Sequence, residues 1–262
     1  MADDKIIQRC LTAASIGVLA AITVTASLDA AGLSLFSALA LFPVLLACWL
    51  FWRMPLTGMG FIWGRPRDYA LAVLFPVIVL GVATLIALVT GALSIDNVHL
   101  KRALVNFSLL FVQSIPVGLI TEEGFFRGWL WASLGQARLS TVKIILVTSI
   151  VFALWHISLV TVAKGFVLPV SQAVIYIVNI GVIGSIWAQM RALSRSIVVT
   201  SVSHSLWNAG TYVLFGTGAF MSGYLGIKQT ELYGAEVGLV GLALNVMFSV
   251  GLWRWCRQVA QP

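Results

Sequence analysis

The sequence LITEEGFFR, residues 119–127, places two adjacent carboxylates inside an otherwise apolar run. Only four glutamates occur in the whole chain, and two of them are Glu122 and Glu123. If this segment is helical, neighbouring side chains point about 100° apart, so the two carboxylates cannot face the same partner. Glu123 and Arg127 share one helix face, in the order that favours an ion pair. We therefore predict a structural ion pair between Glu123 and Arg127, which leaves Glu122 to meet another group.

The composition of the chain predicts a membrane protein. Of its 262 residues, 60% are hydrophobic and only 10% are charged, and the mean hydropathy is +1.00. Soluble domains carry about 25% charged residues. The fold class that we expect is therefore all-α, a polytopic transmembrane helix bundle that forms a single domain over residues 1–262. The three cysteines are scattered and form no C-x-x-C pair, so neither a structural zinc site nor a disulfide framework is predicted.

Apolar segments that are long enough to cross a bilayer, which takes about 20 residues, recur along the chain. We predict about eight spans, at residues 6–28, 33–52, 69–93, 103–134, 142–163, 170–190, 196–215 and 237–253. The fourth is longer than a hydrocarbon core of about 30 Å requires, so it must tilt, kink or break, and Pro116 is the candidate position for a kink. Polar connections separate the spans, among them residues 53–68, 94–102 and 191–195. A glycine-rich connection at residues 216–236 receives no predicted role.

The positive charges in the connections predict the orientation in the membrane. Cytoplasmic loops of membrane proteins are enriched in Lys and Arg. With eight spans, most basic residues fall on the side of the two termini, so both termini are expected in the cytoplasm. This distribution accounts for the net charge of +7 without a nucleic-acid partner. The basic residues on the terminal side are Lys5, Arg9, Arg53, Arg65, Arg67, Arg138, Lys143, Arg191, Arg195, Arg254 and Arg257, and those on the other side are Lys101, Arg102, Lys164 and Lys228.

Two of the three histidines lie inside apolar spans, where polar residues are costly. His204 and Asn208 share one helix face, and Phe152 and His156 share a face in the same way. Counted from the span ends, Glu122, His156 and His204 lie at similar depths, in the middle to cytoplasmic part of the bilayer. Taken singly, such a residue is also typical of a side chain that hydrogen-bonds a neighbouring helix and only stabilises the bundle. Together, they favour one functional site.

This set of side chains suits the hydrolysis of an amide. A carboxylate in an apolar pocket is a good general base towards water, and an imidazole with an amide N–H stabilises a tetrahedral oxyanion. No serine lies in a G-x-S-x-G context and no cysteine lies beside a histidine, so a covalent nucleophile is not predicted. Glu122, His156 and His204 would also suit a zinc ion with a bound water, although the H-E-x-x-H pattern is missing from the sequence.

Three short patterns occur in order on three predicted spans. They are E-E-x-x-x-R at residues 122–127, F-x-x-x-H at residues 152–156 and H-x-x-x-N at residues 204–208. Together they resemble the CAAX protease and bacteriocin-processing family of intramembrane proteases, which includes the type II CAAX prenyl endopeptidases and the Abi proteins. The resemblance implies that Glu122 activates water with the help of His156, and that His204 and Asn208 form the oxyanion site. It implies no metal and no other cofactor, with a zinc-dependent version of the protease as the alternative.

The predicted function is therefore an intramembrane endopeptidase whose motifs lie in a core at residues 103–215. Its expected partners are the lipid bilayer and a membrane-embedded or lipidated peptide or protein substrate, and its expected location is a bacterial or archaeal plasma membrane. Two alternatives belong to other classes. One is a membrane scaffold or immunity protein of the same fold. The other is a proton-coupled transporter that uses Glu122 and the histidines as a relay, which the lack of internal repeats in the sequence disfavours.

Overall fold

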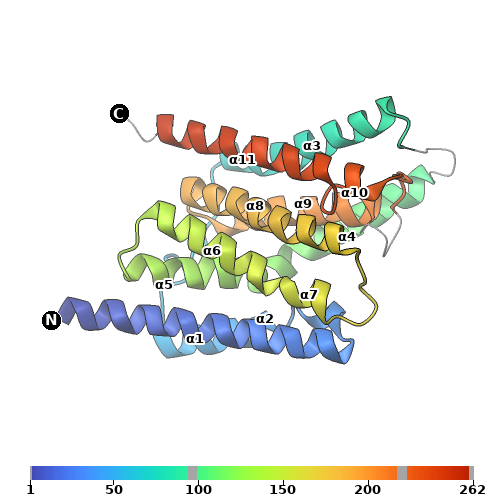
Figure 1. Ribbon diagram of the computed structural model, residues 1–262. Helices are drawn as coiled ribbons and strands as arrows, with labels where there is room; N and C mark the ends of the chain where they lie inside the picture. Colours follow the sequence, from blue (N-terminus) through green and yellow to red (C-terminus); the bar gives the residue numbers. More distant parts are fainter. Residues whose placement is uncertain (1, 94–98, 217–222, 260–262) are drawn as a thin grey trace.

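The chain folds into a bundle of helices that run back and forth along one direction (Figure 1). The computed structural model describes residues 2–93, 99–216 and 223–259. Part of two predicted connections, residues 94–98 and 217–222, lies outside the described residues. The elements are α1 (Ala2–Ala31), η1 (Ser34–Phe36), α2 (Leu41–Trp52), α3 (Pro66–Val89), α4 (Leu100–Ile120), η2 (Glu123–Leu130), α5 (Trp131–Gln136), α6 (Thr141–Trp155), α7 (Ile157–Thr161), α8 (Val170–Ser194), α9 (Ile197–Ala209), η3 (Gly210–Phe215), α10 (Thr230–Tyr233) and α11 (Leu239–Val259).

The described helices confirm the prediction of a polytopic, all-α membrane bundle. Seven of them are long and apolar enough to cross a bilayer. The eighth predicted span, residues 196–215, corresponds to α9 and η3, which follow each other without a break. Its many Ser and Thr side chains make it less apolar than the other spans. The start of α1 and the end of α11 lie at the same end of the bundle, as an even number of passes requires (Figure 1).

Three of the helices are interrupted where polar side chains face the interior. α4 continues through Pro116 to Ile120, and the regular helix stops at Thr121, whose φ of −115° and ψ of −98° are not helical. The next residues form η2, a π-helix, and α9 passes into a second π-helix, η3. Such wide helical turns are frequent at functional sites. The predicted fifth span is divided as well, because α6 ends at Trp155 and His156 separates it from α7.

Aromatic side chains fill the centre of the bundle around α9. This helix packs against α3, α4 and α8, and it carries His204. Trp187 of α8 lies flat on the imidazole of His204, with ring centroids 4.0 Å apart. Trp207 stacks in the same way on Phe75 of α3, with centroids 5.1 Å apart. Because close-packed rings leave a side chain few alternative rotamers, this core fixes the direction in which α9 presents its polar residues.

Candidate functional site

The four side chains predicted to converge line one internal cavity. Glu122, His156, His204 and Asn208 come from three separate spans and share a cavity of about 150 Å³. Its volume leaves room for several water molecules. Other walls come from α1, η1, α8, η3 and the segment before α11. The remaining lining residues are Thr25, Asp29, Ser34, Ser37, Ala38, Phe152, Trp155, Leu159, Tyr176, Ile180, Trp187, Tyr212 and Glu236.

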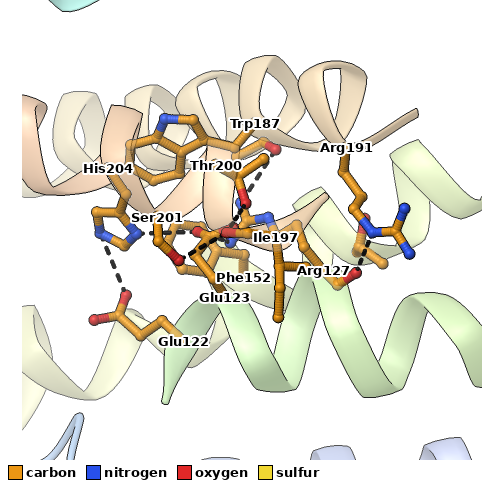
Figure 2. Close-up of polar contacts among 12 residues, drawn as sticks. Glu122, Glu123, Arg127, Phe152, Trp187, Arg191, Ile197, Thr200, Ser201 and His204 are labelled. Carbon is orange, nitrogen blue, oxygen red and sulfur yellow. Dashed lines mark hydrogen bonds and ion pairs between the residues drawn. The ribbon is translucent and has the colours of Figure 1, made fainter. Parts of the chain in front are cut away.

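Glu122 lies at the break between α4 and η2. It directly precedes the first residue of the π-helix, and its side chain is 14% exposed. Its Oε2 lies 3.7 Å from Nε2 of His204, beyond hydrogen-bond distance but close enough for electrostatic attraction when the imidazole is protonated (Figure 2). No hydrogen bond to the Glu122 carboxylate occurs within residues 2–93, 99–216 and 223–259. Glu122 is thus an acid that faces a cavity and retains free acceptor capacity.

His204 lies between the two adjacent glutamates (Figure 2). Its Nδ1 is 3.0 Å from Oε1 of Glu123, and because a carboxylate only accepts, Nδ1 carries the hydrogen of this bond. The ring is therefore held from one side by Glu123 and from above by Trp187, while its Nε2 points towards Glu122. The sequence predicted only Arg127 as the partner of Glu123. The structure adds His204, because α9 packs close to η2.

The predicted ion pair is present on the side of His204 that faces away from the cavity. Arg127 NH1 lies 3.3 Å from Glu123 Oε1, and both side chains are fully buried. Arg127 NH2 donates to the carbonyl of Gly184 at 3.1 Å, and the guanidinium lies 4.2 Å from the centre of the Phe152 ring. A charge that has left water needs several such partners. The pair therefore joins η2 to α6 and α8.

A second buried arginine holds η2 from the end of α8. The sequence placed Arg191 in a basic loop at residues 191–195, but α8 continues to Ser194 and Arg191 is only 5% exposed. Its Nε donates to the carbonyl of Arg127 at 3.0 Å (Figure 2). Its NH2 donates to the carbonyl of Gly58 at 3.2 Å. The buried carbonyl groups of Arg127 and Gly58 need hydrogen-bond donors, and Arg191 supplies them from inside the bundle.

His156 lies at the junction of α6 and α7. Its Nδ1 is 2.8 Å from the carbonyl oxygen of Phe152, which can only accept, so Nδ1 donates. In the neutral ring Nε2 then keeps a lone pair. The rings of Phe152 and Trp155 contact the imidazole edge to face, each with a centroid distance of 4.6 Å. Asn208 lies one helical turn beyond His204 and lines the same cavity.

Two acidic residues of the cavity were not predicted from the sequence. Glu236 reaches it from the connection to which no role was assigned, and Asp29 reaches it from the end of α1. Asp29 is 1% exposed, and its two oxygens accept hydrogen bonds from Ser37 and Ser158, each at 2.6 Å. The sequence could have indicated both residues by their rarity. Few acids occur in this apolar chain, and each buried one needs a physical reason.

The same side chains are the donors that a metal ion would need. Within the part of the chain that the structure describes, no three His, Cys, Asp or Glu side chains form a group that could hold one. Nδ1 of His156 and Nδ1 of His204 are both engaged in hydrogen bonds. The two Nε2 atoms and the Glu122 carboxylate are the donors that the zinc alternative would have to bring together.

The fold and the polar cavity define a multi-pass membrane protein with its candidate site among the helices of the bundle. Residues 104–210 match the family model described as type II CAAX prenyl endopeptidase Rce1-like. This match confirms the resemblance predicted from the three motifs, and the family is one of endopeptidases. No curated protein matches the chain. The matched segment contains Glu122, His156, His204 and Asn208, whereas Asp29 and Glu236 lie outside it.

Proposed function

We propose that this protein is an intramembrane endopeptidase in which Glu122 activates a water molecule. The observation that carries the proposal is the contrast within the glutamate pair. Glu123 is fully buried and bonded to Arg127 and His204, whereas Glu122 faces the cavity without a hydrogen bond from the described residues. A general base needs free acceptor capacity and access to water, and Glu122 has both. The substrates that fit an Rce1-like domain are membrane-embedded or lipidated peptides and proteins.

His156 supports the activation of water. Because its Nδ1–H is donated to the Phe152 carbonyl, the neutral ring presents Nε2 as an acceptor. A water molecule between this atom and the Glu122 carboxylate would donate one hydrogen to each. Two acceptors fix the direction of the oxygen lone pair that attacks the substrate. This orientation lowers the entropic part of the barrier.

His204 and Asn208 are suited to stabilise the oxyanion. With Nδ1 of His204 fixed by Glu123, the protonated ring directs its Nε2–H towards the cavity. The carboxamide of Asn208 offers a further N–H from the next turn of α9. Both groups are on one rigid helix whose position is set by stacking of Trp187 and Trp207, so they need little rearrangement when negative charge develops.

With these side chains, hydrolysis of the peptide bond proceeds by addition of water and loss of the amine. Glu122 takes one proton from water, and the resulting hydroxide attacks the carbonyl carbon of the scissile amide. The carbonyl π-electrons move to oxygen, which His204 and Asn208 stabilise. When the C–N bond breaks, the amide nitrogen takes up a proton and leaves as an amine, and the carbonyl is restored as a carboxylic acid. Over the whole cycle, the proton that Glu122 took from water is the one gained by nitrogen, so Glu122 is ionised again. The net result is the addition of one water molecule across the peptide bond.

The test is the replacement Glu122→Gln in purified protein, which keeps the size of the side chain and removes the base. Cleavage of membrane-associated peptides, prenylated and unmodified, should fall by about 10²–10⁴-fold in kcat, since that is the usual contribution of a general base. The matched control is Glu231→Gln, the same chemical change at an exposed glutamate in α10, which should keep wild-type activity. Equal cleavage by wild type and Glu122→Gln would remove Glu122 as the base.

Two further outcomes decide between the alternatives. Activity that survives exhaustive chelation, in protein without detectable zinc, supports the metal-free mechanism. Activity that is lost on chelation and restored by added zinc replaces it with the zinc-dependent version. Failure of the wild-type protein to cleave any peptide of a broad panel, with the fold intact, supports the scaffold or immunity protein instead.

A further inference from the structure

Glu236 is a third acid of the cavity, after Glu122 and Asp29, and the proton transfer proposed for Glu122 does not involve it. It lies in the short segment between α10 and α11, outside the residues that match the Rce1-like family. The residue is 7% exposed, and its side chain lines the same cavity as Glu122 and Asn208. A buried carboxyl group is costly, so its presence inside a membrane bundle calls for a physical reason.

The backbone around Glu236 is fixed by a chain of buried amides. Asn179 of α8 donates from Nδ2 to the carbonyls of both Ala235 and Glu236, each at 3.0 Å. Asn245 of α11 in turn donates from Nδ2 to Oδ1 of Asn179 at 2.9 Å. Asn179 and Asn245 are both fully buried. Two inaccessible carboxamides thus hold one short loop, which is what a positioned side chain requires.

Close backbone packing adds to this constraint. A Cβ atom on Gly238 would lie 2.5 Å from the backbone nitrogen of Gly234, and one on Gly241 would collide with the carbonyl of Ala235. Glycine at both positions lets the start of α11 press against the loop that carries Glu236. The direction in which Glu236 enters the cavity is therefore set by backbone contacts from two helices.

The carboxyl group of Glu236 has a neutral partner in place of a cation. Nε1 of Trp207 donates to its Oε1 at 2.7 Å. Within the described part of the chain, no Lys, Arg or His forms an ion pair with Glu236. Burial raises the pKa of Glu236 to about 7, and the hydrogen bonds from Trp207 and Thr211 together with the nearby His204 offset this only in part. The titratable groups that act on it are Glu122, His204, Tyr176 and Tyr212. Near neutral pH, Glu236 can hold a proton and release it.

We propose that Glu236 is the general acid that protonates the leaving amine, while Glu122 is the base. This inference rests on the proposed function. As the C–N bond of the tetrahedral intermediate breaks, its electron pair goes to nitrogen, which takes the proton of the Glu236 carboxyl. The proton that Glu122 took from water then returns to Glu236 through water in the cavity, and both acids regain their starting forms. One peptide bond and one water molecule are consumed, and one acid and one amine are produced.

The assignment divides two proton transfers between two differently placed acids. Glu122 lies 3.7 Å from an imidazole that can carry a positive charge, whereas Glu236 has an indole N–H as its donor. Pairs of acids whose surroundings differ in this way are the usual arrangement for a base and an acid in one site. Glu236 touches the departing nitrogen in this scheme, so it is a catalytic residue and not only a support for Trp207.

The experiment compares an amide substrate with an activated ester of the same peptide, such as a nitrophenyl ester, whose leaving group needs no proton. Glu236→Gln keeps an acceptor for Trp207 and removes the acid. On the amide, kcat should fall about 10²-fold or more, and on the ester it should stay within a few-fold of wild type. Glu122→Gln should be impaired on both substrates, because attack by water is required in both cases.

The pH profile provides the second readout. For the wild type, kcat/KM on the amide should fall as the pH rises through the pKa of Glu236, because the acid is then deprotonated. Glu236→Gln should lack this alkaline limb. In Trp207→Phe the carboxyl remains but loses the donor that favours its ionised form, so the limb should move to higher pH. Trp207→Phe is informative even if Glu236→Gln does not fold.

Several outcomes would overturn the inference while the proposed function stands. They are an amide activity of Glu236→Gln equal to that of wild type, an equal loss on amide and ester, or an alkaline limb that Glu236→Gln retains. An equal loss on both substrates would assign Glu236 a purely structural role. Failure of the proposed function has a different signature, since wild type would then cleave neither substrate or Glu122→Gln would cleave both normally.

Discussion

Acidic side chains lie on both sides of the His204 ring, and the one on the inner side is paired with an arginine. On the inner side, Glu123 and Arg127 are fully buried, and they bond to each other and to further partners. On the cavity side, Glu122 has an imidazole at 3.7 Å and no hydrogen bond from the described residues, and Glu236 has neutral donors, chief among them the indole of Trp207. In this comparison the acid paired with an arginine supports the fold, whereas the acids that face the cavity are the ones that we propose to react. It predicts that substitutions on the two sides affect different measurements.

The largest effect on stability is expected from Arg127→Ala. This change leaves Glu123 as an uncompensated charge in the interior, which typically costs about 3–5 kcal/mol. The free energy of unfolding in detergent or bicelles should fall by this amount, and a matched control, Arg102→Ala at an exposed position in α4, should change it little. A stable but inactive Arg127→Ala protein would break the comparison, because it would move the inner side into the chemistry.

Asn208→Ala should show the reverse behaviour on the cavity side. Loss of one donor to an oxyanion typically lowers kcat by about 10²–10³-fold, or about 3–4 kcal/mol of transition-state stabilisation. KM and the free energy of unfolding should change little, because the carboxamide lines a cavity rather than a packed contact. Asn106→Ala, an exposed carboxamide of α4, is the control. An unfolding midpoint that drops together with kcat would instead place Asn208 among the supports of the bundle.

The smallest effect expected is a pH dependence of stability that comes from Glu236. Its pKa rises from 4.5 to about 7 on folding, so the folded state holds the proton more tightly than the unfolded state does. The stabilisation linked to this proton is complete below pH 4.5 and is lost as the pH rises through about 7. It amounts to at most about 3 kcal/mol.

Thermal unfolding between pH 4.5 and 8 measures this linkage. Glu236→Gln should flatten the decline in stability across this interval, whereas Glu231→Gln, at an exposed position, should leave it unchanged. A wild-type protein whose stability rises through the same interval would contradict the assignment of a protonated Glu236 near neutral pH.

Much of the fold follows from the sequence, because composition and span length are local properties. Apolar segments of about 20 residues can only be buried in lipid or in the bundle, so the all-α membrane class was predictable. The two π-helices were not, since a hydrophobic pattern does not show whether a turn holds one more residue. The break at Thr121 follows Pro116 by five residues, so the sequence indicated an irregular element but not the position of the interruption.

The candidate site was predictable in its motifs and unpredictable in its surroundings. Glu122, His156, His204 and Asn208 are rare polar residues in apolar spans, and their periodic spacing showed which of them share a helix face. Glu236 and Asp29 depend on contacts between segments far apart in the chain, as in the bonds from Trp207 and from Ser158. No local periodicity encodes such contacts. The inward turn of Arg191 was missed for the same reason, because a terminal arginine on a helix normally faces water.

The tie between Asp29 and its two serines has a consequence for how this protein can vary. Asp29 and Ser37 line the cavity from α1 and the connection to α2, outside the matched segment, whereas Ser158, which also bonds to Asp29, lies within that segment. The shape of the cavity and the motif residues that line it therefore depend partly on separate segments of the chain. Substitutions in the first 40 residues can therefore change the shape of the cavity while every motif residue stays in place. Proteins that share the three motifs would then catalyse the same reaction and still differ in substrate range.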